Sequence, residues 1–84
     1  MAEEKQIAKI FSYFTHVGVA AMKLDAPLKV GDTIHVKGHT TDFKQKVDSM
    51  QIDRKDVKAA KKGDDIGIKV KDRVRPNDVV YKVG

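Results

Sequence analysis

Apolar and polar residues alternate at period two in several segments of this 84-residue chain, and no stretch of helical length carries an apolar stripe at period 3.6. Residues 66–70, IGIKV, place their isoleucines and valine on one parity, and residues 33–37, TIHVK, alternate in the same way. In residues 78–83, DVVYKV, the alternation puts Val79, Tyr81 and Val83 on one face. Such alternation is typical of strands with one buried and one wet face. The chain is therefore predicted to be all-β.

Three further segments also read as strands, but their apolar residues occupy both parities. Strands are expected at about residues 6–14 and 17–23, which include KIFSYF and VGVAAM. That pattern indicates strands covered on both sides or strands with their own bulges. In residues 42–53, DFKQKVDSMQID, the apolar parity changes between Val47 and Met50, so we expect a bulge near Asp48 and Ser49. A single helical turn is expected at about residues 57–61.

A turn residue followed by an aspartate and a strand occurs three times, beginning at Gly31, Gly63 and Asn77. Glycine and asparagine tolerate positive φ, and the aspartate that follows can accept backbone N–H groups and hold the turn. We interpret the phrase as one structural corner used three times, not as a catalytic device. An apolar residue stands three positions before each turn residue: Leu28, Ala60 and Val74.

Six strands with short connections predict a barrel or a sandwich, and in so short a chain a closed barrel is favoured because closure removes exposed strand edges. We therefore expect one domain over residues 1–84, folded as a small closed six-stranded antiparallel β-barrel. The chain has no cysteine, which excludes disulfides and thiolate chemistry. It contains no Walker A, GxGxxG or HExxH pattern. We expect a binding protein that is not an enzyme, holds no cofactor and hydrolyses no nucleotide.

Two histidines and a carboxylate offer the one candidate metal site. His35, His39 and Asp42 could approach one another around a turn and supply a two-histidine, one-carboxylate ligand set. We favour the interpretation that His35 is a solvent-facing strand residue and His39 a turn residue, so no metal is expected. The first ten residues, MAEEKQIAKI, do not resemble a secretory signal, and VGVAAM is too short to span a bilayer. A soluble cytoplasmic protein with no membrane partner is expected.

The chain carries a net charge of +5, and residues 42–75 hold eleven basic and seven acidic groups, a balance of +4. Because aspartates dilute the basic residues, an ordinary solvated face is favoured over a nucleic-acid footprint on charge alone. The high lysine content and the single asparagine suit a protein from a thermophile.

Four pieces, VGDTIHV, KVDSMQIDR, AAKKGDDIGIKV and RPNDVVYKV, follow one another within about residues 17–83. In this order they resemble the second domain of translation GTPases, typified by elongation factor Tu. Similar barrels also occur at the end of collagenase-like peptidases. The resemblance implies a closed six-stranded barrel acting as a stand-alone binding module. Its implied partners are tRNA, another RNA or a translation-related protein.

The resemblance also implies a site. Gln51 and Arg54 stand where that family helps hold the aminoacylated 3′ end of tRNA, although Gln51 replaces the glutamate of elongation factor Tu. The proposed RNA-binding face bears Gln51, Arg54 and Lys55. Tyr13 is expected to be exposed and to stack on a base, because Phe11 and Phe14 cannot both share its face.

An alternative function from a different class remains open. The apolar residues on both parities of the two N-terminal strands leave surplus apolar surface, which often marks a protein interface. In that interpretation the barrel is an adaptor that docks on a GTPase, on a peptidase-like enzyme or on a second copy of itself, without binding RNA.

Overall fold

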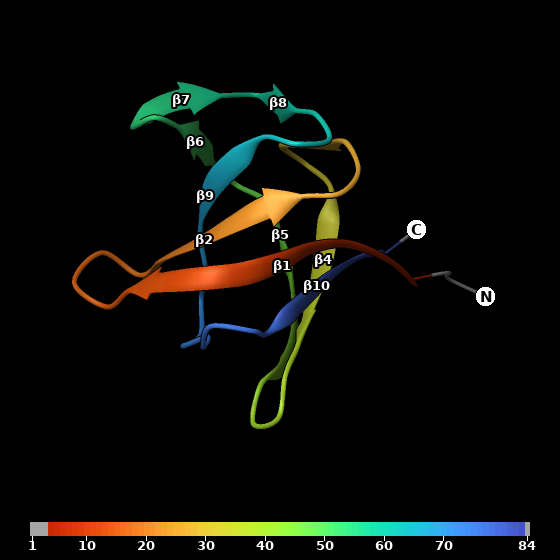
Figure 1. Ribbon diagram of the computed structural model, residues 1–84, viewed down its shortest axis with the longest axis vertical. Helices are drawn as coiled ribbons and strands as arrows, with labels where there is room; N and C mark the ends of the chain where they lie inside the picture. Colours follow the sequence, from red (N-terminus) through yellow and green to blue (C-terminus); the bar gives the residue numbers. More distant parts are fainter. Residues whose placement is uncertain (1–3, 84) are drawn as a thin grey trace.

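The computed structural model describes residues 4–83, which form ten β-strands and no helix (Figure 1). The predicted domain limits, residues 1 and 84, lie outside the described residues. No helix among residues 4–83 is long and apolar enough to cross a membrane. The strands are β1 (Glu4–Phe14), β2 (Val19–Leu24), β3 (Leu28–Lys29), β4 (Thr33–Lys37), β5 (Asp42–Lys46), β6 (Met50–Ile52), β7 (Lys55–Val57), β8 (Ala59–Ala60), β9 (Asp65–Lys69) and β10 (Val79–Val83).

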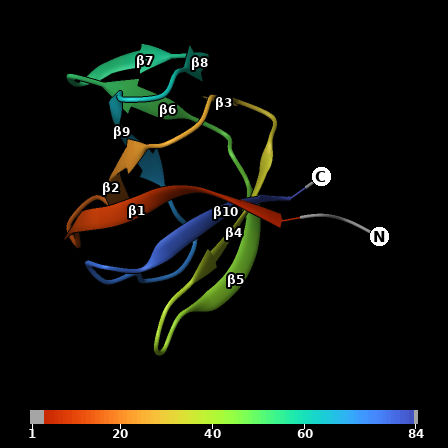
Figure 2. The same cartoon turned by 45° about the vertical axis from the view of Figure 1, so that its right-hand side comes forward.

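Eight of these strands form one antiparallel sheet in the order β5-β4-β10-β1-β2-β9-β6-β7, and β3 pairs with β8 in a separate two-stranded sheet. The sheet curls strongly, so that β1 and β10 cross the middle of the molecule while β6 and β7 lie at one end (Figure 2). The two ends of the described chain meet in this sheet, because Glu4 of β1 pairs with Val83 of β10. All pairings are antiparallel, which confirms the all-β prediction.

The closed six-stranded barrel is not found. Within residues 4–83 the large sheet ends at β5 on one side and at β7 on the other, and no backbone ladder joins these ends. The chain leaves the sheet between Lys46 and Met50, so the predicted bulge is instead a break that separates β5 from β6. Val47 and Met50 are nevertheless both buried, so the predicted change of parity does occur there.

Two other predictions of local structure are also wrong. The helical turn expected at residues 57–61 is replaced by the ends of two short strands, Lys55–Val57 and Ala59–Ala60, because β8 pairs with β3. In the last strand the buried residue is Val80, not Val79, Tyr81 and Val83. Val80 pairs with buried Val36 on one side and buried Ala8 on the other, so the neighbouring strands decide which parity faces inward.

The three predicted corners are confirmed in detail. Gly31, Gly63 and Asn77 have φ values of 99°, 94° and 78°. At each corner the following aspartate accepts a hydrogen bond from the backbone N–H three residues earlier, at 3.0, 3.0 and 2.9 Å. Those three pairs are Lys29 with Asp32, Lys61 with Asp64, and Arg75 with Asp78. The apolar residues before the corners pack inward: Leu28 and Val74 are buried, and Ala60 packs against the core.

One continuous core fills the inside of the curled sheet. Its largest fully buried members are Ile7, Ile10, Met22, Leu24, Leu28, Ile34, Met50 and Ile68. The N-terminal strand contributes through two irregularities of register, one between Gln6 and Ala8 and one between Ile10 and Ser12. These bulges confirm one of the two explanations offered for its apolar residues on both parities.

Candidate interaction surface

The second bulge of β1 decides which aromatic side chains reach solvent. Beyond it, Tyr13 pairs with buried Ala20 and packs against the core, so Tyr13 is half-buried. Phe11 and Phe14 turn outward instead and are 55% and 53% exposed. The expectation that Tyr13 is the exposed aromatic is therefore wrong, because one extra residue in the strand reverses the facing of every side chain after it.

Val17, in the turn between β1 and β2, extends this apolar area and is 59% exposed. The turn is fixed by Gly18, which has φ 68° and donates its N–H to Phe14 O at 2.8 Å. We call Phe11, Phe14 and Val17 the aromatic edge. These three side chains line one hollow together, and grouped exposed apolar side chains, unlike single ones, often mark an interaction site.

The aromatic edge borders a hollow of about 670 Å³ on the outer face of β1, β2, β9 and β6. The floor of the hollow includes Ala21 and Gly67, which pair across β2 and β9, and Gly67 pairs in turn with Gln51 of β6. These small side chains leave the centre of the sheet surface low. A Cβ atom at Gly67 would lie 3.0 Å from Val19 Cγ1, so even alanine there meets a neighbour.

The opposite side of the hollow is formed by the turn between β6 and β7. Asp53 and Arg54 have φ values of 55° and 66°, and positive φ at both central residues is the signature of a type I′ hairpin. This conformation is strained for arginine, at a cost of about 1–2 kcal/mol. Within residues 4–83 Arg54 takes part in none of the salt bridges, so its guanidinium is available at the hollow.

The structure thus brings together two of the four predicted site residues. Gln51 and Arg54 line the hollow, and Gln51 also donates a hydrogen bond to Asp56 at 3.0 Å. Lys55 is exposed on β7 and does not line the hollow, and Tyr13 faces the core. Sequence reasoning missed Phe11, Phe14, Val17 and Gly67 as site residues. The apolar residues on both parities of the first two strands were the signal for the first three.

His35 occupies a separate cluster and is not a solvent-facing strand residue. It is only 7% exposed, and its two ring nitrogens face the carboxylates of Glu4, at 2.8 Å, and Asp42, at 2.5 Å. Hydrogen bonding to His35 lowers the pKa of Glu4 and of Asp42 below their ordinary values. His39 is exposed and lies outside this cluster, and no group of three or more potential ligands is placed to hold a metal within residues 4–83.

The fold is that of a known class of domain. A crystal structure of the C-terminal domain of a Geobacillus thermoleovorans protein described as a U32 peptidase superposes with a TM-score of 0.88. The match covers 93% of this chain and 99% of that domain at 18% sequence identity, so it establishes the fold alone.

Sequence relatives point the same way. The chain is 43% identical over 77 residues to an uncharacterized protease of Methanocaldococcus jannaschii, and 35% identical over 82 residues to a collagenase of Porphyromonas gingivalis. These matches include 90% and 95% of this chain, but the chain spans only 19% and 23% of the two relatives' length. No family model matches the chain.

These relatives overturn the resemblance to the second domain of translation GTPases, and the expected translation function is wrong with it. The RNA-binding role expected of Gln51, Arg54, Lys55 and Tyr13 followed from that function and loses its basis. The similarity that the comparisons support is the one to domains of collagenase-like peptidases. Corner and strand patterns such as those at Gly31, Gly63 and Asn77 encode a β-fold and carry no information about the partner.

Proposed function

We propose that this domain is a non-catalytic docking module of a U32-type peptidase. The domain packs its aromatic edge and hollow against the body of the peptidase. The observation that carries the proposal is the exposure of Phe11, Phe14 and Val17 beside a hollow floored by Ala21 and Gly67. Surfaces with central aromatic anchors and a polar border are typical of protein interfaces.

The energy available at this surface is large for so small a domain. A phenylalanine side chain buries about 150–250 Å² when fully covered, so each half-exposed ring leaves roughly 100 Å² in water. Covering that area contributes about 2.5 kcal/mol for each ring at about 25 cal/mol per Å². The two rings together contribute about 5 kcal/mol, which offsets only the lower estimates of the entropic cost of association, so they can anchor an interface but do not supply all of its affinity.

The lengths of the relatives support this kind of partner. The matching region is about a fifth of each relative, so in those proteins it is covalently joined to a much larger remainder. A domain tethered in this way meets the remainder at high effective concentration, which favours a stable contact between the two. We infer that the remainder holds the peptidase chemistry and that the β-domain positions it or its substrate.

This division of labour agrees with the polar groups of the domain. The buried histidine, His35, has both ring nitrogens engaged by the carboxylates of Glu4 and Asp42. A histidine held in this way cannot accept a proton from a nucleophile while it keeps both contacts. The arrangement supports a structural role for His35 and a binding role for the domain.

The test is a binding measurement in trans. The Methanocaldococcus jannaschii relative is prepared without the fifth that matches this chain, and its affinity for the present domain is measured by calorimetry. The relative's own matching fifth serves as the positive control. Replacement of an anchor, Phe14→Ser, should weaken binding about 30-fold, because an aromatic anchor contributes about 2 kcal/mol.

The matched control is Val30→Ser, which removes an exposed apolar side chain, 37% exposed, that does not line the hollow. Val30→Ser should leave binding unchanged. Equal effects of the two substitutions would contradict the proposal. A domain that self-associates through Phe14 and ignores the peptidase would also contradict it, since the partner would then be a second copy of the chain.

A further inference from the structure

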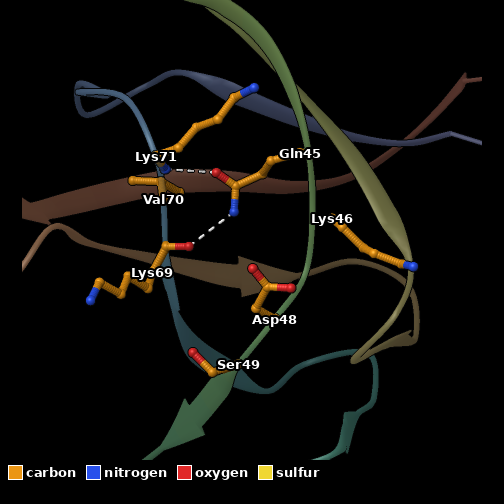
Figure 3. A pocket seen from close by; sticks show the side chains of 7 residues that line it. All are labelled: Gln45, Lys46, Asp48, Ser49, Lys69, Val70 and Lys71. Atoms are coloured by element: carbon orange, nitrogen blue, oxygen red, sulfur yellow. Dashed lines mark hydrogen bonds between the residues drawn. The ribbon is translucent and has the colours of Figure 1, made fainter.

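A second opening in the surface lies beside β5, one end of the large sheet. It has a volume of about 430 Å³ and separates the end of β5 from the segment that follows β9 (Figure 3). Gln45 crosses this gap: its Nε2 donates to Lys69 O at 2.9 Å, and its Oε1 accepts from Lys71 N at 2.8 Å. The gap shares no lining residue with the hollow beside the aromatic edge.

The two bonds of Gln45 reproduce the pairing of a β-strand. In a parallel ladder, one residue donates its N–H to the carbonyl before its partner and accepts from the N–H after it. Gln45 makes these two bonds on either side of Val70 with a single side-chain amide. Val70 directs its own N–H the other way, to Gly18 O at 2.9 Å. The backbone around Val70, just beyond the end of β9, therefore has its pairing position filled by a side chain.

A polypeptide backbone can replace that amide without loss. An incoming residue would supply one N–H and one C=O to Lys69 and Lys71, so both backbone groups would stay satisfied while Gln45 moves into water. Addition of an extended segment at a sheet edge is a common mode of peptide recognition, in which backbone hydrogen bonds provide the affinity.

The charges around the gap select the kind of segment. Lys46, Lys69 and Lys71 line it together with a single carboxylate, that of Asp48 (Figure 3). None of the three lysines takes part in the salt bridges found within residues 4–83. The ammonium ends of Lys46 and Lys69 point outward on the two sides of the gap (Figure 3), so the excess of three ammonium groups over one carboxylate lies at its rim and favours acidic side chains there.

We infer that the gap is a docking site for an extended acidic segment of another polypeptide chain, which pairs with the backbone at Lys69 and Lys71 in place of Gln45. This site is separate from the docking surface of the proposed function and does not depend on it.

The experiment is an amide chemical-shift titration of the isotope-labelled chain. The probe is an octapeptide of alternating valine and glutamate with blocked ends. Saturable shifts are expected at the backbone N–H of Lys71 and at the side-chain amide of Gln45. A peptide of the same sequence with every backbone nitrogen methylated should not bind, because neither of its edges keeps the N–H donor that the pairing requires. Polyphosphate tests whether charge alone suffices and should give no saturable shift at Lys71.

Substitution of Gln45 provides the decisive variant. Gln45→Ala removes the competing amide, so the peptide should bind about 10- to 30-fold more tightly, corresponding to two hydrogen bonds of about 1 kcal/mol each. The matched control is Gln6→Ala, which removes an exposed glutamine amide on β1 that lines neither the gap nor the hollow and should leave the affinity unchanged.

Several results would overturn the inference. They are unchanged or weaker binding by Gln45→Ala, equal binding of the methylated peptide, and shifts at Lys71 that polyphosphate reproduces. The titration of the unsubstituted chain decides the matter even if a variant fails to fold. Shifts confined to Phe14 and Gly67 would reject the gap and leave the peptidase-docking proposal standing, whereas failure of the Phe14→Ser test would leave the gap unaffected.

Discussion

Asp78 should be the most costly of the three corner aspartates to replace. Its carboxylate accepts the N–H of Arg75 at 2.9 Å and is nearly buried, with 5% of the residue exposed. Asp64 accepts the N–H of Lys61 at 3.0 Å in the same geometry but is only half-buried. The corners at Asp78 and Asp64 therefore have the same local structure and differ in how far water reaches the carboxylate.

The expected magnitudes follow from this difference. A hydrogen bond to a charged acceptor contributes about 1.5–3 kcal/mol, and a buried N–H that loses its acceptor keeps the full cost of desolvation. Asp78→Ala should therefore lower the free energy of unfolding by about 2 kcal/mol. Water can replace the carboxylate at Asp64, so Asp64→Ala should cost about 1 kcal/mol.

The Asp78 corner also fastens the N-terminal strand. Ile10 N donates to Asp78 O at 2.8 Å, and Asn77 N donates to Ile10 O at 2.7 Å. Loosening of this corner disturbs two backbone bonds to β1, whose Ile10 is fully buried. This coupling adds to the expected difference between the two substitutions.

Calorimetry measures the effect directly. For a domain of this size, 1 kcal/mol lowers the midpoint of thermal unfolding by about 4–8 °C. The expected decreases are about 8–16 °C for Asp78→Ala and about 4–8 °C for Asp64→Ala. Asp→Asn at each position keeps an acceptor oxygen and should recover part of the loss. Equal losses at the two positions, or a larger loss at Asp64, would refute the argument from burial.

Two further predictions concern contacts that involve the neighbouring strands. Gly38→Ala should destabilise the fold by about 1–3 kcal/mol, because a Cβ at this position would overlap the carboxylate of Asp78. Its cost should shrink when Asp78→Ala is also present, which a double-mutant cycle by urea unfolding measures, and additive costs would contradict the clash. The carboxylates beside His35 predict an acid dependence: since the folded-state pKa values of Glu4 and Asp42 are lowered, their contribution to stability is present above about pH 4.5 and is lost as the pH falls through those lowered values. Urea unfolding compares His35→Gln with the unsubstituted chain between about pH 2 and 6. The stability lost in the variant should shrink at the acid end, and profiles of stability against pH that stay parallel would contradict this linkage.

Much of the local structure could be read from the sequence. The corners at Gly31, Gly63 and Asn77 form as expected, because positive φ and aspartate capping depend only on residues that are close in the chain. The parity change between Val47 and Met50 was also visible, because it requires only that both side chains be buried. Most strand positions were also predictable, because the alternation of apolar and polar residues is a short-range pattern.

The exposed surface could not be predicted residue by residue. Whether Tyr13 or Phe14 faces solvent depends on the bulge between Ile10 and Ser12, and that bulge is defined only by the pairing of β1 with β2. His35 illustrates the same limit. Its burial comes from Glu4, which is distant in sequence, and from Asp42, so alternation along its own strand assigned it to the wrong environment.

The sequence by itself determined an all-β chain, because alternation and turn chemistry are short-range properties. Only the tertiary structure decided that the sheet stays open at Gln45 and that an aromatic edge stands beside a hollow. The physical reason is that closure and exposure depend on the register between distant strands. A shift of one residue in that register moves a side chain from the core to the solvent.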